Sequence, residues 1–186
     1  MKTMVGILAL LAMLFTGVSV ASAYPSIITV DSVSNAVDSA MTNYYTGGVG
    51  YVFPVGTYIL SPYSGAWNAW GPDVVNIIED NDLSNDQGYM WNMFIFQETT
   101  SQKYQLGDWT HKYYTPQQAL NAYLGQSIVI NQPTEGNIWF FIEDGYPSDN
   151  WGTVSASVSP VPEPATLSLL GFGLLGLVFR RKKASN

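Results

Sequence analysis

Hydrophobic and polar positions alternate in short blocks along the middle of this 186-residue chain. Runs rich in Val, Ile, Phe, Tyr and Trp are separated by clusters of Gly, Pro, Asn and Asp, a pattern typical of β-strands joined by turns. No repeat of solenoid or propeller length interrupts the pattern. It predicts a mainly all-β fold, an antiparallel β-sandwich of the jelly-roll kind with one short helix. Strands are expected at residues 26–30, 49–53, 57–61, 74–79, 88–98, 127–131, 138–144 and 152–158.

The segment 88–98, GYMWNMFIFQE, differs from the other expected strands because apolar side chains fall on both of its faces. An antiparallel strand with one face in water would instead alternate apolar and polar residues. We therefore expect this strand to be central and covered on both sides.

One helix is expected within residues 114–126, YTPQQALNAYLGQ. Thr115 is suited to cap its N-terminus, Pro116 to occupy its first position, and Gly125 to end it. Apolar residues recur at helical spacing, so one stripe of the helix should pack on the sheets. The stripe consists of Ala119, Leu120, Tyr123 and Leu124.

The first 23 residues have the composition of a secretory signal peptide. Lys2 precedes an apolar run from Val5 to Val18, and Ala21-Ser22-Ala23 follows. We expect signal peptidase to cut after Ala23, because the apolar core is short for an uncleaved membrane anchor. What remains before the tail is one domain, residues 24–159, followed by a linker over 159–164 and a C-terminal signal over 160–186.

The net charge of this domain limits the kinds of partner that it can bind. Residues 24–159 contain no cysteine, two cations (Lys103 and Lys112) and thirteen of the fourteen acids, a net charge of −11. Such a surface repels phosphate backbones, which excludes nucleic acid as a partner. It suits divalent cations or neutral polymers such as glycans.

The tail VPEPATLSLLGFGLLGLVFRRKKASN combines three features in order. Pro162-Glu163-Pro164 comes first, the uncharged segment 165–179 follows, and four basic residues end the run: Arg180, Arg181, Lys182 and Lys183. As a helix the segment would reach about 22 Å, which with snorkelling basic ends could just span a membrane. The basic residues would then remain cytoplasmic and the domain outside.

On these three elements the last 26 residues resemble the PEP-CTERM sorting signal. The resemblance implies a Gram-negative bacterium that makes extracellular polysaccharide. It also implies that an exosortase-type enzyme processes the tail near 162–164 and releases the protein from the membrane to the cell surface or matrix. The alternative is an ordinary single-pass anchor.

Residues 114–158, with SGAWNAWG at 64–71, are similar to the C-terminal half of a β-sandwich common among exported proteins with this tail. The chain departs from that pattern with Trp151 and a single Gly152, where a small residue and paired glycines are usual. The loop between the last two strands is more loosely similar to that of calcium-dependent galactose-binding lectins.

Two groups of oxygen-bearing residues are candidate calcium ligands. Asp144, Asp149 and Asn150, with Glu143 adjacent, lie at a strand end and in the loop that follows, where hard oxygen ligands can converge on Ca²⁺. The alternative is that they form turn hydrogen bonds.

The second group is Asp80 and Asp82, with Asn85 and Asp86, in EDNDLSNDQG. It is not an EF-hand, because counting from Asp80 the sixth residue is not Gly and the twelfth is not Glu. The alternative for this segment is a solvated acidic loop.

Three tryptophans in turns rich in Gly, Asn and Asp are candidates for stacking on sugar rings: Trp67, Trp70 and Trp151. We expect these side chains to be exposed, because an exposed ring offers a large, rigid apolar face. The alternative is that they fill the core.

Catalytic signatures are sparse. A zinc cluster of His and Cys is excluded by one histidine, His111, and no cysteine. No serine lies in a nucleophile elbow, so we expect His111 to be a surface or turn residue and not a catalytic base. The favoured function is a non-catalytic surface or structural role associated with extracellular polysaccharide. The alternatives are a calcium-dependent carbohydrate-binding module and, third, a small glycosidase, which needs only two carboxylates.

Overall fold

The computed structural model describes residues 24–38, 47–77 and 86–162. The expected signal peptide up to Ala23, the acidic residues Asp80 and Asp82, and the tail from Glu163 onward, including the segment 165–179 and Arg180–Lys183, lie outside the described residues. The fold below is that of the domain between them.

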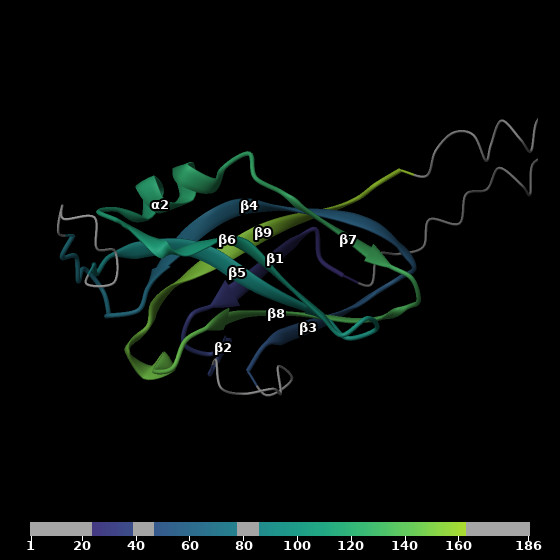
Figure 1. Cartoon of the computed structure of the whole chain (residues 1–186), viewed down its shortest axis with the longest axis horizontal. Helices are drawn as coiled ribbons and strands as arrows, with labels where there is room; N and C mark the ends of the chain where they lie inside the picture. The colour runs from purple at the N-terminus through teal and green to yellow at the C-terminus, as the bar shows by residue number, and fades with distance from the viewer. Residues whose placement is uncertain (1–23, 39–46, 78–85, 163–186) are drawn as a thin grey trace, which may run out of the picture.

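The described chain is mainly β, as the pattern predicts, and its strands form one curled sheet (Figure 1). The strand order is β1-β9-β4-β5-β8-β2, with β3 on β8, β6 on β5 and β7 on β4. All pairings are antiparallel except the short one between β2 and β8. The strands are β1 (Ile27–Asp31), β2 (Ala36–Val37), β3 (Val49–Phe53), β4 (Gly56–Asn68), β5 (Tyr89–Gln97), β6 (Gln102–Tyr113), β7 (Ile128–Gln132), β8 (Gly136–Glu143) and β9 (Trp151–Pro160).

Strand β4 is the reason that the sheet curls. It pairs with β7 at its start, with β9 along most of its length, and with β5 through only its last two residues, Trp67 and Asn68. A bulge shifts its register between Pro62 and Ser64, which bends a strand and increases its twist. The sequence pattern predicts only residues 57–61 of this strand, because Pro62 and the following Gly65 read as a turn.

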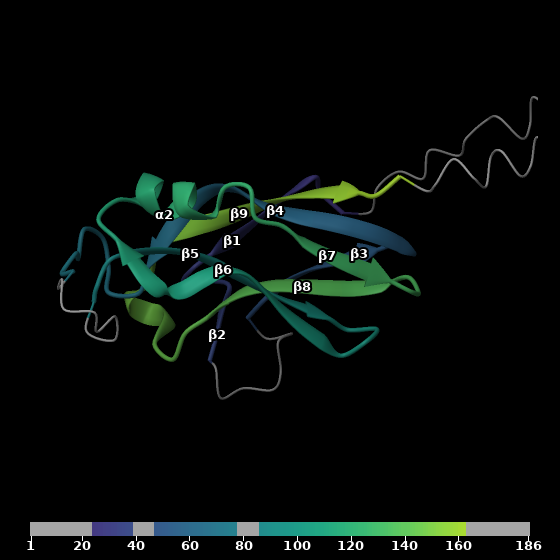
Figure 2. The ribbon, with the colours of Figure 1, turned by 45° about the horizontal axis from the view of Figure 1, so that its top comes forward.

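The two halves of the curled sheet face each other across the core. Figure 2 shows β4 and β9 on one side and β8 on the other. The Phe53 ring of β3 stacks on Tyr24 at 4.3 Å and meets Tyr58 of β4 edge-on at 5.1 Å. Fully buried residues of both halves, such as Val30 and Phe140, belong to the same cluster. The arrangement is therefore sandwich-like, although the halves are continuous.

The prediction that 88–98 forms a central strand is confirmed. Strand β5 pairs with β4, β6 and β8, and only Phe96 among its residues is not fully buried. Its inner face carries Trp91 into the main core, while Phe94 on its outer face stacks on Phe141 at 5.9 Å in a small second cluster with Val37.

Two expectations about elements are wrong, and one strand was not predicted. The strand expected at 74–79 is, in its described part, a single bridge between Asn76 and Gln87. Strand β6 was not predicted, because QKYQLGDWTHKY is polar and lies at a sheet edge, where alternation is weak. The linker expected from 159 is not free either: β9 runs to Pro160, and the Val161 N–H donates to the Thr57 carbonyl at 2.8 Å.

The helix prediction is confirmed. Helix α2 (Pro116–Tyr123) begins after Thr115, whose side chain accepts a hydrogen bond from the Gln118 N–H at 3.2 Å. Ala119 and Tyr123 are buried against the core, whereas Leu124 is exposed. Across the described residues, no helix has the length and apolar character needed to cross a membrane.

Candidate functional site

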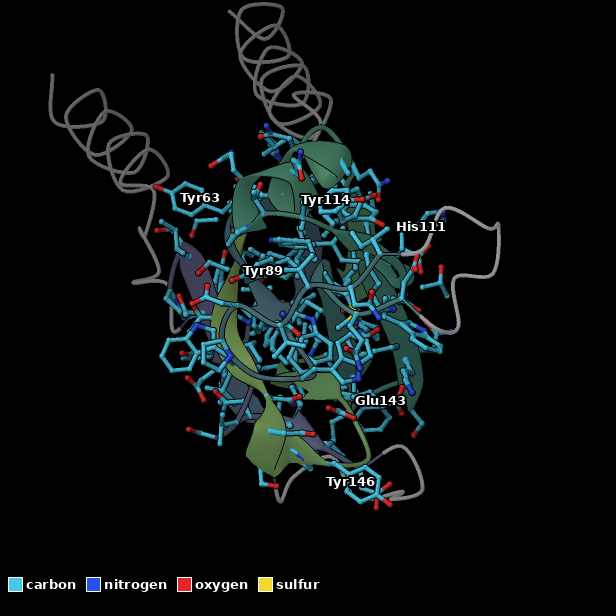
Figure 3. All side chains as sticks on the ribbon, turned by 90° about the vertical axis from the view of Figure 1, so that its left-hand side faces the viewer. Tyr63, Tyr89, His111, Tyr114, Glu143 and Tyr146 are labelled. Atoms are coloured by element: carbon cyan, nitrogen blue, oxygen red, sulfur yellow. The ribbon has the colours of Figure 1, made fainter. Side chains whose placement is uncertain are left out.

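A pocket of about 600 Å³ lies on the outer face of β5, at the end of the domain where β4 and β8 finish. Figure 3 views the molecule from this end: the labelled Glu143 and His111 lie on the same side of it, and Tyr146 marks the loop after β8. Buried apolar side chains form the base of the pocket, and a half-buried and an exposed tryptophan join polar groups around it. The lining residues are Trp67, Ala69, Trp70, Asp86, Met90, Phe94, Trp109, Thr110, Lys112, Glu143, Asp144 and Gly145.

A large irregularity in β6 places two of these side chains. Trp91 of β5 pairs with Asp108, but Tyr89, two residues earlier, pairs with Tyr113. The four residues between, which include Trp109 and Lys112, have no partners on β5 and bulge from the ladder. The bulge therefore supplies an aromatic ring and a cation to the pocket, in line with the tendency of bulges to re-aim side chains at functional sites.

Asp108 holds the bulge together. Its carboxylate accepts hydrogen bonds from the Thr110 N–H and hydroxyl, both at 2.8 Å, and lies 2.9 Å from His111 Nδ1. Burial raises the pKa of Asp108, but the bonds from Thr110 and His111 outweigh it, so the pKa lies below its ordinary value. His111 is thus exposed at the surface, as expected, although it lies within strand β6 and not in a turn.

Lys112 lies between two tryptophan rings. Its Nζ is 5.5 Å from the centre of the Trp70 ring and 5.6 Å from that of Trp109, which is cation–π distance. The ammonium donates to the Trp109 carbonyl and to that of Thr110 at 3.3 Å. Desolvation lowers the pKa of Lys112, and the carboxylates of Asp108 and Asp86 partly oppose this.

The domain's other cation lies on the opposite flank. Lys103 Nζ donates to both carboxylate oxygens of Glu143, at 2.6 and 2.7 Å, and lies 4.7 Å from the centre of the Phe94 ring. Lys112 therefore lines the pocket, whereas Lys103 contacts two residues that line it, Glu143 and Phe94.

Asp144, which lines the pocket, and Asn92, which is fully buried and does not line it, each have a buried polar atom without a hydrogen-bond partner: Asp144 Oδ2 and Asn92 Nδ2. Asn92 lies between Met90 and Phe94 on the outer face of β5, and its Oδ1 accepts from Trp67 Nε1 at 2.8 Å. Asp144 Oδ1 accepts from the Tyr146 N–H at 3.3 Å. Buried polar groups without partners are rare in proteins and cost about 1–3 kcal/mol each.

The three tryptophans predicted to stack on sugars differ in exposure and in whether they line the pocket. Trp67 is only 2% exposed, so the expectation of exposure is wrong, although its edge lines the pocket base. Trp70 is half-buried and lines the pocket. Trp151 is 54% exposed at the start of β9 but does not line it. Sequence reasoning did not choose Trp109, which is 53% exposed and lines the pocket. The sequence feature that could have pointed to Trp109 is the Gly-Asp pair before it, which is typical of a turn.

Among the described residues, the predicted calcium ligands Asp144 and Asp149 do not belong to a carboxylate cluster. The described residues contain no group of three or more His, Cys, Asp or Glu side chains able to hold a metal ion. Glu143 is bound to Lys103, and Asp149 is exposed. Asn150 Nδ2 donates to the Ser32 carbonyl at 2.8 Å, while its Oδ1, like Asp144 Oδ2, is buried without a partner. Calcium binding stays a prediction that rests on those two oxygens.

Comparison with known families concerns the tail. Residues 160–182 match the family model of the PEP-CTERM protein-sorting motif. The chain is therefore an exported protein with a PEP-CTERM signal, sorted at the cell envelope through an exosortase-type enzyme. No curated protein and no solved structure matches the chain.

Proposed function

We propose that this chain is a non-catalytic protein of the cell surface or extracellular matrix of a Gram-negative bacterium. It is released from the membrane after exosortase processing and is held in extracellular polysaccharide by the pocket beside β5. The observation that carries the proposal is the pocket lined by Trp70 and Trp109 together with the polar side chains of Thr110 and Asp144.

The chemistry of the pocket suits a sugar. Sugar rings have apolar faces that stack on indole rings, and edges rich in hydroxyls that both donate and accept hydrogen bonds. The pocket offers both features within one site of suitable size.

The hydrogen bonds made by the carboxylates of Glu143 and Asp144 favour a non-catalytic role. A glycosidase uses one carboxyl group as an acid and a second as a base or nucleophile. Glu143 has both oxygens bound by Lys103, and Asp144 has one oxygen bound by a backbone N–H. Neither is arranged as a freely available acid–base group.

The test is binding of the cell's own matrix polysaccharide by the released protein, measured by calorimetry. We expect binding in the wild type and at least a tenfold loss in Trp109→Ala. Trp151→Ala is the matched control, because the two rings are almost equally exposed and only Trp109 lines the pocket. Equal losses in both variants, or release of reducing sugar, would contradict the proposal.

The second candidate is calcium-dependent glycan binding, which Asp144 Oδ2 and Asn150 Oδ1 favour because both are buried acceptors without donors. A ligand that binds only the folded state raises the melting temperature. On this view Ca²⁺ at millimolar concentration raises it, and the double variant Asp144→Asn, Asp149→Asn removes the gain. No shift with Ca²⁺ and no effect of a chelator on glycan binding would reject this candidate.

A further inference from the structure

We propose that strand β7 is an interface at which two copies of this chain pair edge to edge, so that the sheet continues from one copy into the other. Two features support this interface: the uncharged edge of β7 and the exposed apolar side chains beside it. The interface is separate from the pocket, to which β7 contributes no residue.

Strand β7 lies at an edge of the sheet. Among the described strands it pairs only with β4, so its other edge has no neighbouring strand. The surrounding sequence LGQSIVINQPT, residues 124–134, contains no charged side chain. No proline lies within the strand, and its register against β4 has no bulge. An edge without charge, proline or bulge is a template for pairing with another chain.

The other terminal strands of the sheet differ from β7 in this respect. Strand β6 carries Lys103, Asp108 and Lys112 and bulges from its partner. Strand β1 ends at Asp31, and β2 is only two residues long. Strand β3 contains Gly50, and a glycine weakens a strand. Each of these features hinders the addition of a further strand, so β7 is the edge best suited to pairing.

The outer face of the sheet beside this edge is apolar. Val129 is 57% exposed and lies directly opposite Ile59 of β4, which is 37% exposed. The Asn131 carbonyl already accepts from Gln97 Nε2 at 2.8 Å, so we place the centre of the pairing at Val129. With a second β7 antiparallel and Val129 opposite Val129, two valines and two isoleucines form one row across both copies. Such cross-strand pairs of β-branched side chains stabilise a sheet.

The charge of the domain favours a second copy that docks through this edge and not through another surface. Residues 24–159 have a net charge of −11, so two copies repel each other where their charged surfaces meet. Contact along β7 brings together only uncharged side chains. A strand that pairs with itself in the antiparallel sense has twofold symmetry, and the assembly therefore closes as a dimer.

Sedimentation velocity of the released wild-type protein tests this pairing without a variant. We expect a monomer–dimer equilibrium in which the dimer is the main species at about 100 μM protein. The dimer should become tighter as salt is raised, because salt screens the repulsion between two acidic domains. A monomer at every concentration, open-ended aggregates, or association that salt weakens would overturn the inference. Polysaccharide is not involved, so each of these results leaves the proposed function in place.

A single cysteine reports the position of the interface, because the chain has none of its own. Val129→Cys places the two thiols opposite each other, within reach of a disulfide, and mild oxidation should give a cross-linked dimer. Ile59→Cys is the matched control one strand away, where the two thiols would lie about 14 Å apart and could not be joined. Equal cross-linking of both variants, or none in either, would overturn the inference.

Val129→Lys tests the same contact by charge. Two ammonium groups would then face each other across the twofold axis, and we expect the dimer to dissociate at least about tenfold more readily. Ser159→Lys is the charge-matched control, because Ser159 is exposed in the same row but lies on β9, away from the edge. We expect it to keep the wild-type dimer, and equal weakening by both lysines would overturn the inference.

Discussion

Asn92 and Trp67 are linked by a buried side-chain hydrogen bond. Trp67 Nε1 donates to Asn92 Oδ1 at 2.8 Å, and both side chains are buried. A hydrogen bond between buried groups contributes modestly when it is made, but losing one partner leaves the other unpaired and costly. This bond therefore fixes the orientation of the Asn92 amide, whose Nδ2 is buried without an acceptor.

The variant Trp67→Phe tests the contribution of this hydrogen bond to stability. The change keeps most of the ring volume but leaves Asn92 Oδ1 without a donor, so we expect a loss of about 1–3 kcal/mol in the free energy of unfolding. Urea denaturation measures it, and Trp151→Phe on the exposed ring is the control, with an expected change within about 0.5 kcal/mol. A similar small change in both variants would show that the bond is unimportant.

Asp31 gives the domain a pH dependence at low pH. Its Oδ1 accepts from the N–H groups of Val33 and Ser34, at 3.0 and 2.7 Å, and from the Ser34 hydroxyl at 2.9 Å. The Ser34 N–H bond is the main reason that the pKa of Asp31 lies below its ordinary value. A carboxyl with a lowered pKa in the folded state stabilises it above the unfolded-state pKa, and this contribution disappears as pH falls through the folded-state value.

We therefore expect Asp31→Ala to cost about 1 kcal/mol near neutral pH and almost nothing at about pH 2. The measurement is the difference in urea midpoint between wild type and variant across that range. A difference independent of pH would contradict the assignment.

Residue-level prediction from the sequence succeeded where a residue's role depends on its neighbours in the chain. Thr115 and Pro116 act at the start of α2 as expected because capping is local. The burial of Trp67 could not be predicted from the sequence, because the Gly-rich residues around it indicate a turn. In the structure, β4 continues past its bulge, so Trp67 lies in a strand. Its burial depends on β5 and β9, which lie far away in the sequence.

Whole elements were likewise predictable where local sequence determines them, and not where pairing with distant strands does. The central strand β5 was predictable because two apolar faces leave only one place for a strand, the middle of the sheet. The bulge of β6, which supplies three of the twelve residues that line the pocket, was not predictable, because its register against β5 is a long-range property. The pocket could therefore be suspected from its aromatic residues but not located.

Helix α2 offers a graded test of packing. Tyr123 is buried and meets the Tyr113 ring edge-on at 6.3 Å, Leu120 is partly buried, and Leu124 is exposed. We expect losses in the free energy of unfolding of about 3–5 kcal/mol for Tyr123→Ala, about 1–2 for Leu120→Ala, and under about 0.5 for Leu124→Ala. Chemical denaturation gives the order, and a cost for Leu124→Ala equal to that of Leu120→Ala would show that the stripe packs differently.

At the scale of the whole molecule, the pocket and the sorting signal lie at opposite ends of β9. Asn68 at the pocket end of β4 pairs with Trp151, and Tyr58 at the other end pairs with Pro160. Ten residues of strand separate these ends, about 30 Å at the usual rise. In Figure 1 the yellow end of β9 points away from the end that carries the pocket. The domain thus presents its pocket on the side opposite its point of attachment.

The sheet also reaches the sorting motif without a spacer. The motif match begins at residue 160, and the Val161 N–H is still bonded to the Thr57 carbonyl. Cleavage near Pro162–Pro164 would leave β9 complete, so processing should neither unfold the domain nor alter the pocket.

Changing Pro162-Glu163-Pro164 to alanines tests this arrangement. Because the motif directs processing, we expect an unprocessed form that is retained in the membrane fraction, with a higher mass than the released wild-type protein. Because strand β9, about 30 Å long, separates the pocket end of the domain from Pro160, where the motif match begins, the retained form should bind polysaccharide with wild-type affinity after extraction in detergent. Mass spectrometry of the membrane and released fractions, followed by calorimetry, measures both parts. Release of the variant at the wild-type mass would show that the motif is not used, and retention with loss of binding would show that the pocket depends on processing.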